Sequence, residues 1–174
     1  MAVKKGLVVT GGSAGAALLL AIPFIGGWEG KSNDPYKDIV GVTTVCYGET
    51  RVQMRRYTDE ECTEMLAKAV ENDFMKPVAK STPTIAERPY ELAAATSLAY
   101  NIGLGNYQKS SARKLFLQGK FIEGCKAFRP WDKVRRLGKL VASRGLVNRR
   151  KDEIKLCLQG SMTEREATSL AASL

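Results

Sequence analysis

The sequence predicts an α+β protein, with a small β lobe near its start, a mainly helical lobe after it, and a weakly hydrophobic segment before both. Three observations predict this class. Residues 6–28 carry no charge, residues 40–47 are rich in β-branched side chains and contain a glycine, and most of the chain after residue 57 repeats its apolar residues at helical spacing. A small sheet at one end of a helical chain is an α+β arrangement.

The uncharged segment of residues 6–28 would span roughly 35 Å as a helix, which is enough to cross a bilayer core. Lys4 and Lys5 precede it and orient its N-terminus toward the cytoplasm. Half of residues 7–26 are Gly, Ala, Ser or Thr, and Pro23 lies near the outer end, so insertion is expected to be weak. One alternative is a cleaved signal peptide, although bulky side chains stand where its cleavage site needs a small one. The other is a buried core helix, which the glycine content disfavours because glycine makes a poor helix in water.

The rest of the chain reads as one hairpin followed by helices. The turn at residues 33–35 and the β-branched stretch that follows predict the hairpin. Thr58 with Glu61 is a capping box that begins a helix, which we expect to end at Pro77. Residues 87–102 predict the central buried helix. Further helices are expected over residues 110–118, 121–128 and 146–158, and Thr163 with Glu166 offers another capping box in a polar tail.

The composition excludes several chemistries. The chain has 27 Lys and Arg against 18 Asp and Glu, a net charge of +9, and no histidine. Without an imidazole, Ser-His-Asp and Cys-His catalysis and the common His-bound zinc sites are ruled out, so carboxylates must carry any hydrolysis. The four cysteines form no CxxC pair, and we expect neither metal nor cofactor. The positive charge favours nucleic acid, an anionic membrane or a cell-wall polymer, without selecting among them.

Three residues could carry hydrolysis of a glycoside. Glu29 directly follows Trp28 and the apolar segment, and an apolar setting raises the pKa of a carboxyl toward the range useful for a general acid. Asp38 lies beyond a turn and so projects from a different element, and Thr44 offers a hydroxyl that could hold a water. An acid, a carboxylate and a water-holding hydroxyl suit glycoside hydrolysis with inversion. These residue types are common, so the spacing alone is weak.

The residues around these three are more specific. They are Glu29-Gly30, Tyr36-Lys37-Asp38, Gly41, Thr44 and Cys46-Tyr47-Gly48. Together they resemble the catalytic region of phage lysozymes of the T4 type, the muramidase family that includes many endolysins. The resemblance covers about residues 28–160 and extends to Tyr100-Asn101-Ile102-Gly103, to Trp131 and to Asn148-Arg149-Arg150. It implies a lysozyme-like fold.

The resemblance also implies an activity, the hydrolysis of the β-1,4 bond between N-acetylmuramic acid and N-acetylglucosamine in peptidoglycan. Glu29 would protonate the leaving oxygen, and Asp38 with Thr44 would hold the attacking water. Arg149 would pair with Glu29, while Asn101, Trp131 and Tyr36 would support the site or bind substrate. One departure is Glu49, which stands where many relatives carry a histidine. Any hydrogen bond that depends on that histidine is therefore in doubt, and the spare carboxylate could compete for a catalytic role.

With its weakly apolar start, the chain resembles the signal-anchor-release endolysins of phages that infect Gram-negative bacteria. This resemblance implies that residues 1–28 tether an inactive enzyme to the host inner membrane, N-terminus in the cytoplasm, and later leave the bilayer. Residues 29–160 would form the lysozyme domain and residues 161–174 a polar tail. The enzyme released to the periplasm would be a monomer that binds peptidoglycan and no nucleic acid.

In the periplasm, two disulfides would suit the four cysteines. Cys125 could bridge Cys157, and Cys46 could bridge Cys62. Two rival functions stay open at this point. One is a membrane-tethered nucleic-acid-binding protein, because residues 133–151 contain eight Lys and Arg. The other is a non-catalytic wall-binding module on the same fold.

Overall fold

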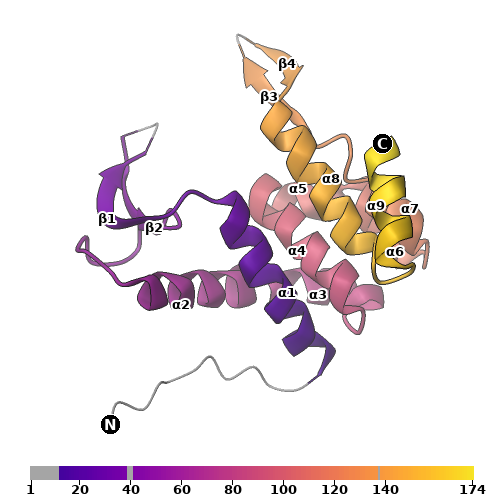
Figure 1. Ribbon diagram of the computed structural model, residues 1–174, viewed down its shortest axis with the longest axis horizontal. Helices are drawn as coiled ribbons and strands as arrows, with labels where there is room; N and C mark the ends of the chain where they lie inside the picture. Colours follow the sequence, from indigo (N-terminus) through magenta and orange to yellow (C-terminus); the bar gives the residue numbers. More distant parts are fainter. Residues whose placement is uncertain (1–11, 39–40, 137) are drawn as a thin grey trace.

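The computed structural model describes residues 12–38, 41–136 and 138–174 (Figure 1). Helices form most of the molecule, and two short hairpins extend from it. In chain order the elements are α1 (Ser13–Trp28), β1 (Ser32–Lys37), β2 (Thr43–Cys46), α2 (Asp59–Ala69), η1 (Val70–Met75), α3 (Lys76–Ser81), η2 (Pro83–Ile85), α4 (Pro89–Ile102), α5 (Leu104–Lys109), α6 (Ser111–Leu117), α7 (Phe121–Lys126), β3 (Lys133–Arg136), β4 (Lys139–Ala142), α8 (Arg144–Leu158) and α9 (Glu164–Ser173).

The small lobe is the antiparallel hairpin β1–β2, in which Tyr36 lies opposite Thr44. A disulfide between Cys46 and Cys62 ties the end of β2 to α2. These cysteines and Val45 are buried together in a second, smaller core. The lobe is therefore fixed to the helical lobe by a covalent bond as well as by the chain.

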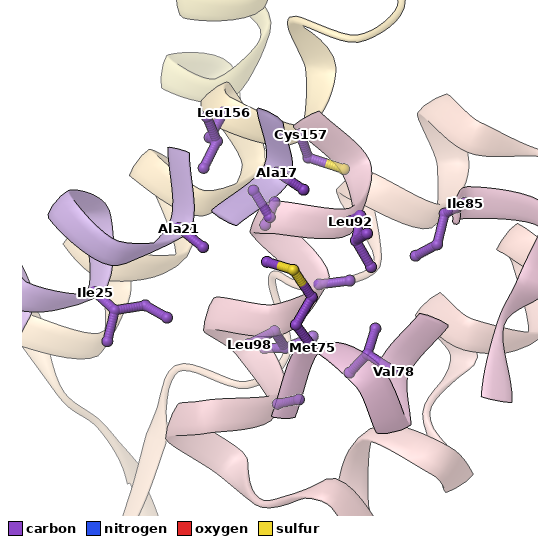
Figure 2. Packing of buried hydrophobic residues seen from close by; sticks show 14 of the residues in the cluster. Ala17, Ala21, Ile25, Met75, Val78, Ile85, Leu92, Leu98, Leu156 and Cys157 are labelled. Carbon is purple, nitrogen blue, oxygen red and sulfur yellow. The ribbon is translucent and has the colours of Figure 1, made fainter. Parts of the chain in front are cut away.

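The main core surrounds α4, whose residues 91–99 are all buried. Helices α1 and α8 both pack against α4, so α4 is the central helix expected from the sequence. Figure 2 shows Ala17, Ala21 and Ile25 of α1 pointing into this core, together with Leu92 and Leu98. The small alanines allow the backbone of α1 to lie close to α4.

Helix α1 covers the second half of the segment expected to be a membrane anchor, and here it is a core helix. Its outward side still carries apolar residues, of which Leu19 is 60% exposed. Among the residues that the structure describes, no helix has both the length and the apolarity needed to cross a membrane. The first part of the expected anchor, residues 1–11, lies outside the described residues.

The helix that begins at the Thr58 capping box continues past Pro77, so the expectation that it ends there was wrong. The capping box itself is present as expected. After α2 the chain passes through one wide π-type turn, η1, and continues as α3 to Ser81. Pro77 is the second residue of α3, where a missing backbone N–H costs little because the preceding π turn has already shifted the hydrogen-bond register.

The hairpin β3–β4 was not expected from the sequence. Lys133 pairs with Ala142 and Arg136 with Lys139, and Gly138 forms the turn with a positive φ of 79°. In Figure 1, β3–β4 extends above the helices at the end of α8, whereas β1–β2 lies to the left of the helices. The polar tail is also structured, because α9 packs on α8 through buried alanines. A second disulfide joins Cys125 on α7 to Cys157 on α8.

Candidate active site

Glu29 is the first residue after α1, and its side chain meets a single arginine. Nη1 of Arg149 donates to Oε1 of Glu29 at 2.8 Å. The Glu29 side chain is 26% exposed, whereas that of Arg149 is only 5% exposed. The carboxyl is thus held from the protein side by a buried guanidinium and still reaches solvent, which is the access that an acid acting on a bound polymer needs.

Arg149 belongs to a buried ionic cluster on α8. Its Nε donates to Oε1 of Glu153 at 3.2 Å, and Nη2 of Arg150 donates to the same oxygen at 3.1 Å. Ser97 on α4 adds a third donor to that oxygen at 2.7 Å. Nη2 of Arg150 also reaches Oδ1 of Asn101 at 2.9 Å. Burial raises the pKa of Glu153 and lowers that of Arg150, and the two opposite charges offset part of both effects.

The hairpin β1–β2 carries the other two candidate residues. Thr44 is buried, and its hydroxyl lies 3.5 Å from the carbonyl oxygen of Tyr36 directly opposite. Asp38 follows β1 and caps the turn, because its Oδ1 accepts from the backbone N–H of Val42 at 2.8 Å. Asp38 is the first residue after β1, and Thr44 belongs to β2, so the hairpin carries an ordered carboxylate at the end of one strand and a hydroxyl on the other.

Tyr100 on α4 interacts electrostatically with Glu29 and with Glu49, which follows the β1–β2 hairpin. Burial, followed by the negative charge of Glu29, raises the pKa of Tyr100 to about 12. The Tyr100 ring packs on that of Phe74, with 4.8 Å between centroids. It also lines a cavity of about 330 Å³ between the β lobe and the helices, together with Glu49 and Arg51. The cavity thus has aromatic and charged walls.

Glu49 is held by hydrogen bonds from its neighbours. Its Oε1 accepts from the backbone N–H groups of Thr50 and Arg51 at 2.9 and 2.8 Å, and from Nε of Arg51 at 3.2 Å. Arg51 in turn pairs with Asp73 of η1 at 3.0 Å. Burial favours a higher pKa for Glu49, but the hydrogen bonds and charge of Arg51 outweigh it and lower the pKa. This carboxyl is therefore unsuited to serve as a general acid.

The remaining sequence-predicted residues fall into two groups. Asn101 and Trp131 adjoin the Arg149 cluster, since Arg150 donates to the Asn101 side chain and lies 3.5 Å from the carbonyl oxygen of Trp131. The Trp131 side chain packs against the main core. Tyr36 is exposed on β1, away from that cluster in the chain but paired with Thr44.

Sequence reasoning missed Glu153 and Ser97. The spacing of Glu153 from Arg150 and Arg149, three and four residues, was a usable signal, because such pairs meet on a helix surface. The contact of Ser97 with Glu153 depends on how α4 packs against α8, which no local pattern reveals. Burial of Arg149 and Arg150 also removes two of the eight cations that suggested a nucleic-acid surface. In the described ranges, no cluster of Cys, Asp or Glu side chains could hold a metal ion.

Comparison with known proteins identifies the family to which the chain belongs. The phage lysozyme family profile matches residues 26–153. The SAR-endolysin of Pseudomonas phage phiKMV is 39% identical over 151 residues, which cover 84% of this chain and 91% of that protein. The SAR-endolysin of Enterobacteria phage P21 is 37% identical over 139 residues, covering 77% and 79%.

A solved structure gives the same fold. The active form of the P1 phage endolysin Lyz superposes with a TM-score of 0.68 at 25% identity, covering 91% of this chain and 90% of that one. The matched family region includes Glu29, Asp38, Thr44 and Arg149. The chain therefore belongs to the phage lysozyme family of muramidase glycoside hydrolases.

Proposed function

We propose that this endolysin hydrolyses the β-1,4 bond between N-acetylmuramic acid and N-acetylglucosamine with Glu29 as its general acid. The observation that carries this assignment is the contact of a partly exposed Glu29 with the buried Arg149. Arg149 orients one carboxyl oxygen, and the other is left to meet the glycosidic oxygen. Proton transfer from Glu29 to that oxygen lets the C1–O bond break, and the leaving sugar departs as an alcohol.

Asp38 and Thr44 complete the proposed reaction by holding a water on the opposite face of the sugar. The Thr44 hydroxyl donates a hydrogen bond to that water or accepts one from it. Asp38 takes a proton from the water as the water oxygen attacks C1. Attack from the face opposite the leaving group inverts the configuration at C1. The hydrogen bond of Asp38 to the backbone of Val42 supports this role, because it fixes the carboxylate that must receive the proton.

The test is the rate of lysis of outer-membrane-permeabilised cells by the Glu29→Gln variant. We expect a loss of about 10²–10⁴-fold, since Gln has no proton to give. Glu164→Gln is the control, because Glu164 is 73% exposed on α9 and the variant carries the same charge change. Full activity of Glu29→Gln would overturn the assignment. The products of digested peptidoglycan separate the reaction classes, since reducing ends at muramic acid indicate hydrolysis and anhydro ends a transglycosylase.

We further propose that residues 1–28 first insert in the host inner membrane and are later released, and that the whole chain, with residues 29–160 as its lysozyme domain and 161–174 as its tail, then acts in the periplasm. The packing of α1 supports this proposal. Three of its six buried residues, Gly15, Ala17 and Ala21, are small and suit close contact with α4, and small residues also make lipid insertion weak. While the segment is inserted, Glu29 lies at the lipid interface, and the β lobe cannot meet it.

Two exposed positions on α1 allow a direct test of the anchor. Ala14 and Ala16 both face solvent, so Leu at both positions strengthens lipid insertion without overpacking the core. We expect this variant to stay in the membrane fraction after the membrane is depolarised, while the unchanged chain becomes soluble at full mass. The control carries Ser at both positions and should be soluble earlier. Equal release of all three proteins, or release only after N-terminal shortening, would contradict the proposal.

A further inference from the structure

The buried carboxylate of Glu153 has no place in the mechanism above, yet it contacts the arginine that contacts Glu29. We propose that Glu153 is a positioning residue for the reaction, which orients the Arg149 guanidinium toward Glu29 and balances its charge without touching substrate. This inference rests on the proposed role of Glu29.

The first support is the division of donors on Arg149. Its Nε donates to Glu153 at 3.2 Å and its Nη1 to Glu29 at 2.8 Å. The guanidinium is planar and its donors have a fixed geometry, so a bond at Nε sets the direction in which Nη1 points. The hydrogen bond from Arg149 to Glu153 therefore determines where Nη1 of Arg149 can donate to the Glu29 carboxyl.

The second support is the anchoring of Glu153 itself. Its side chain is 0% exposed, and its Oε1 accepts hydrogen bonds from the hydroxyl of Ser97 on α4 and from Arg149 and Arg150. Its Oε2 lies 2.9 Å from Nε of Arg150. Ser97 belongs to the central helix, so the orientation of Arg149 is fixed relative to the main core and not only to its own helix α8.

The third support is charge balance. Arg149 and Arg150 carry two positive charges, and Glu29 and Glu153 carry two negative charges when ionised, which leaves the buried group neutral. Removing the charge of Glu153 leaves one uncompensated cation, and this favours the ionised form of Glu29. Other ionisable groups also act on this cluster, since Tyr100 of α4 interacts with the charges of Glu29 and Arg149, and Asp132 interacts with the charge of Arg150.

The main experiment compares Glu153→Gln with the unchanged chain on soluble peptidoglycan fragments over a range of pH. We expect kcat to fall about tenfold to a hundredfold with KM nearly unchanged, because misplaced catalytic groups reduce the chemical step. We also expect the alkaline limb of the pH profile to move about one unit lower. The profiles should converge at acidic pH, where Glu153 is itself protonated, since burial raises its pKa.

Glu91→Gln is the matched control. Glu91 is 1% exposed and pairs with Arg88 three residues earlier, so it is also a buried carboxylate in an ion pair on a helix. It contacts Arg88 and Ser161 and no residue of the Glu29 group. We expect this variant to lose thermal stability as Glu153→Gln does, but to keep the unchanged pH profile. A pH profile of Glu153→Gln that matches the unchanged chain, at a temperature where both are folded, would overturn the inference.

A second measurement needs no change at Glu153, in case that variant does not fold. Nitrogen-15 NMR can follow the exchange of the Arg149 Nε proton with water. In Glu29→Gln we expect this proton to remain protected, because its acceptor is Glu153; loss of protection would overturn the inference. The proposed function fails separately, through full lytic activity of Glu29→Gln, so the two results are distinguishable.

Discussion

The backbone N–H of Glu29 donates to the carbonyl oxygen of Ile25 at 3.1 Å, which makes Glu29 the C-cap of α1. Ile25 is fully buried in the main core (Figure 2). The proposed acid is therefore joined by one helical turn to the side chain that fixes α1 in place. Its position depends on the packing of the segment before it.

Shortening Ile25 tests this dependence. We expect Ile25→Ala to lower the free energy of unfolding by about 2–5 kcal/mol, because the cavity it leaves lies in the core. Activity should fall further than stability alone explains, since the last turn of α1 loosens beside Glu29. Chemical denaturation and lysis rates measure the two effects. Leu19→Ala is the control, because Leu19 is largely exposed and its loss should change stability by less than about 0.5 kcal/mol.

The two disulfides should differ in their effect on activity. Cys46–Cys62 closes 16 residues and Cys125–Cys157 closes 32. Replacing both cysteines of either bridge by Ala should cost about 2–4 kcal/mol of unfolding free energy. Only loss of Cys46–Cys62 should also reduce activity at temperatures where the protein is folded, because Cys46 is two residues from Thr44. Equal activity of the two double variants would contradict this.

Gly124 on α7 should not tolerate a methyl group. A Cβ there would lie 2.4 Å from Cε1 of Phe116, whose ring is fully buried. Gly→Ala in a helix is usually stabilising by about 0.5–1 kcal/mol, but we expect Gly124→Ala to destabilise by about 1–3 kcal/mol through this clash. Gly145→Ala on α8 is the control, because a Cβ there would lie 4.0 Å from Oγ of Ser143, which is ordinary van der Waals contact. Thermal unfolding of both variants checks the difference.

The Glu49–Arg51 pair should make stability depend on pH. The pKa of Glu49 is below its ordinary value of 4.5 in the folded protein, so the folded state favours the ionised form. The stabilisation is complete above that value and is lost as the pH falls through the lower folded pKa. The melting temperature of Glu49→Gln should therefore lie below that of the unchanged chain at neutral pH, and the gap should close as the pH falls through the folded pKa, which lies below the ordinary 4.5. A gap that stays constant with pH would refute this account.

Local patterns predicted much of the fold. Both capping boxes begin helices, at Thr58 and Thr163, because their hydrogen bonds involve residues only three apart. The continuation past Pro77 could not be predicted in this way, since the π turn before it depends on packing against α4 and α1. The hairpin β3–β4 was missed because four of its eight strand residues are Lys or Arg, and these basic residues suggested a binding surface.

The site was predictable only in part for a similar reason. The Glu29–Arg149 contact joins residues 120 positions apart, and resemblance to a family indicated it where spacing could not. The place of α1 was ambiguous, because an apolar run of small residues suits both lipid and a protein interior. The contact of Ser97 with Glu153 required the packing of two helices, which only the fold provides.

The packing of α1 limits how the chain can be shortened. A protein begun at residue 29 would lack the helix that covers one side of α4, and would expose apolar side chains there to water. Such a truncation would be expected to aggregate, even though every residue assigned to the chemistry is present. A shortened version of the chain that is meant to stay soluble must therefore retain the sixteen residues of α1, Ser13–Trp28.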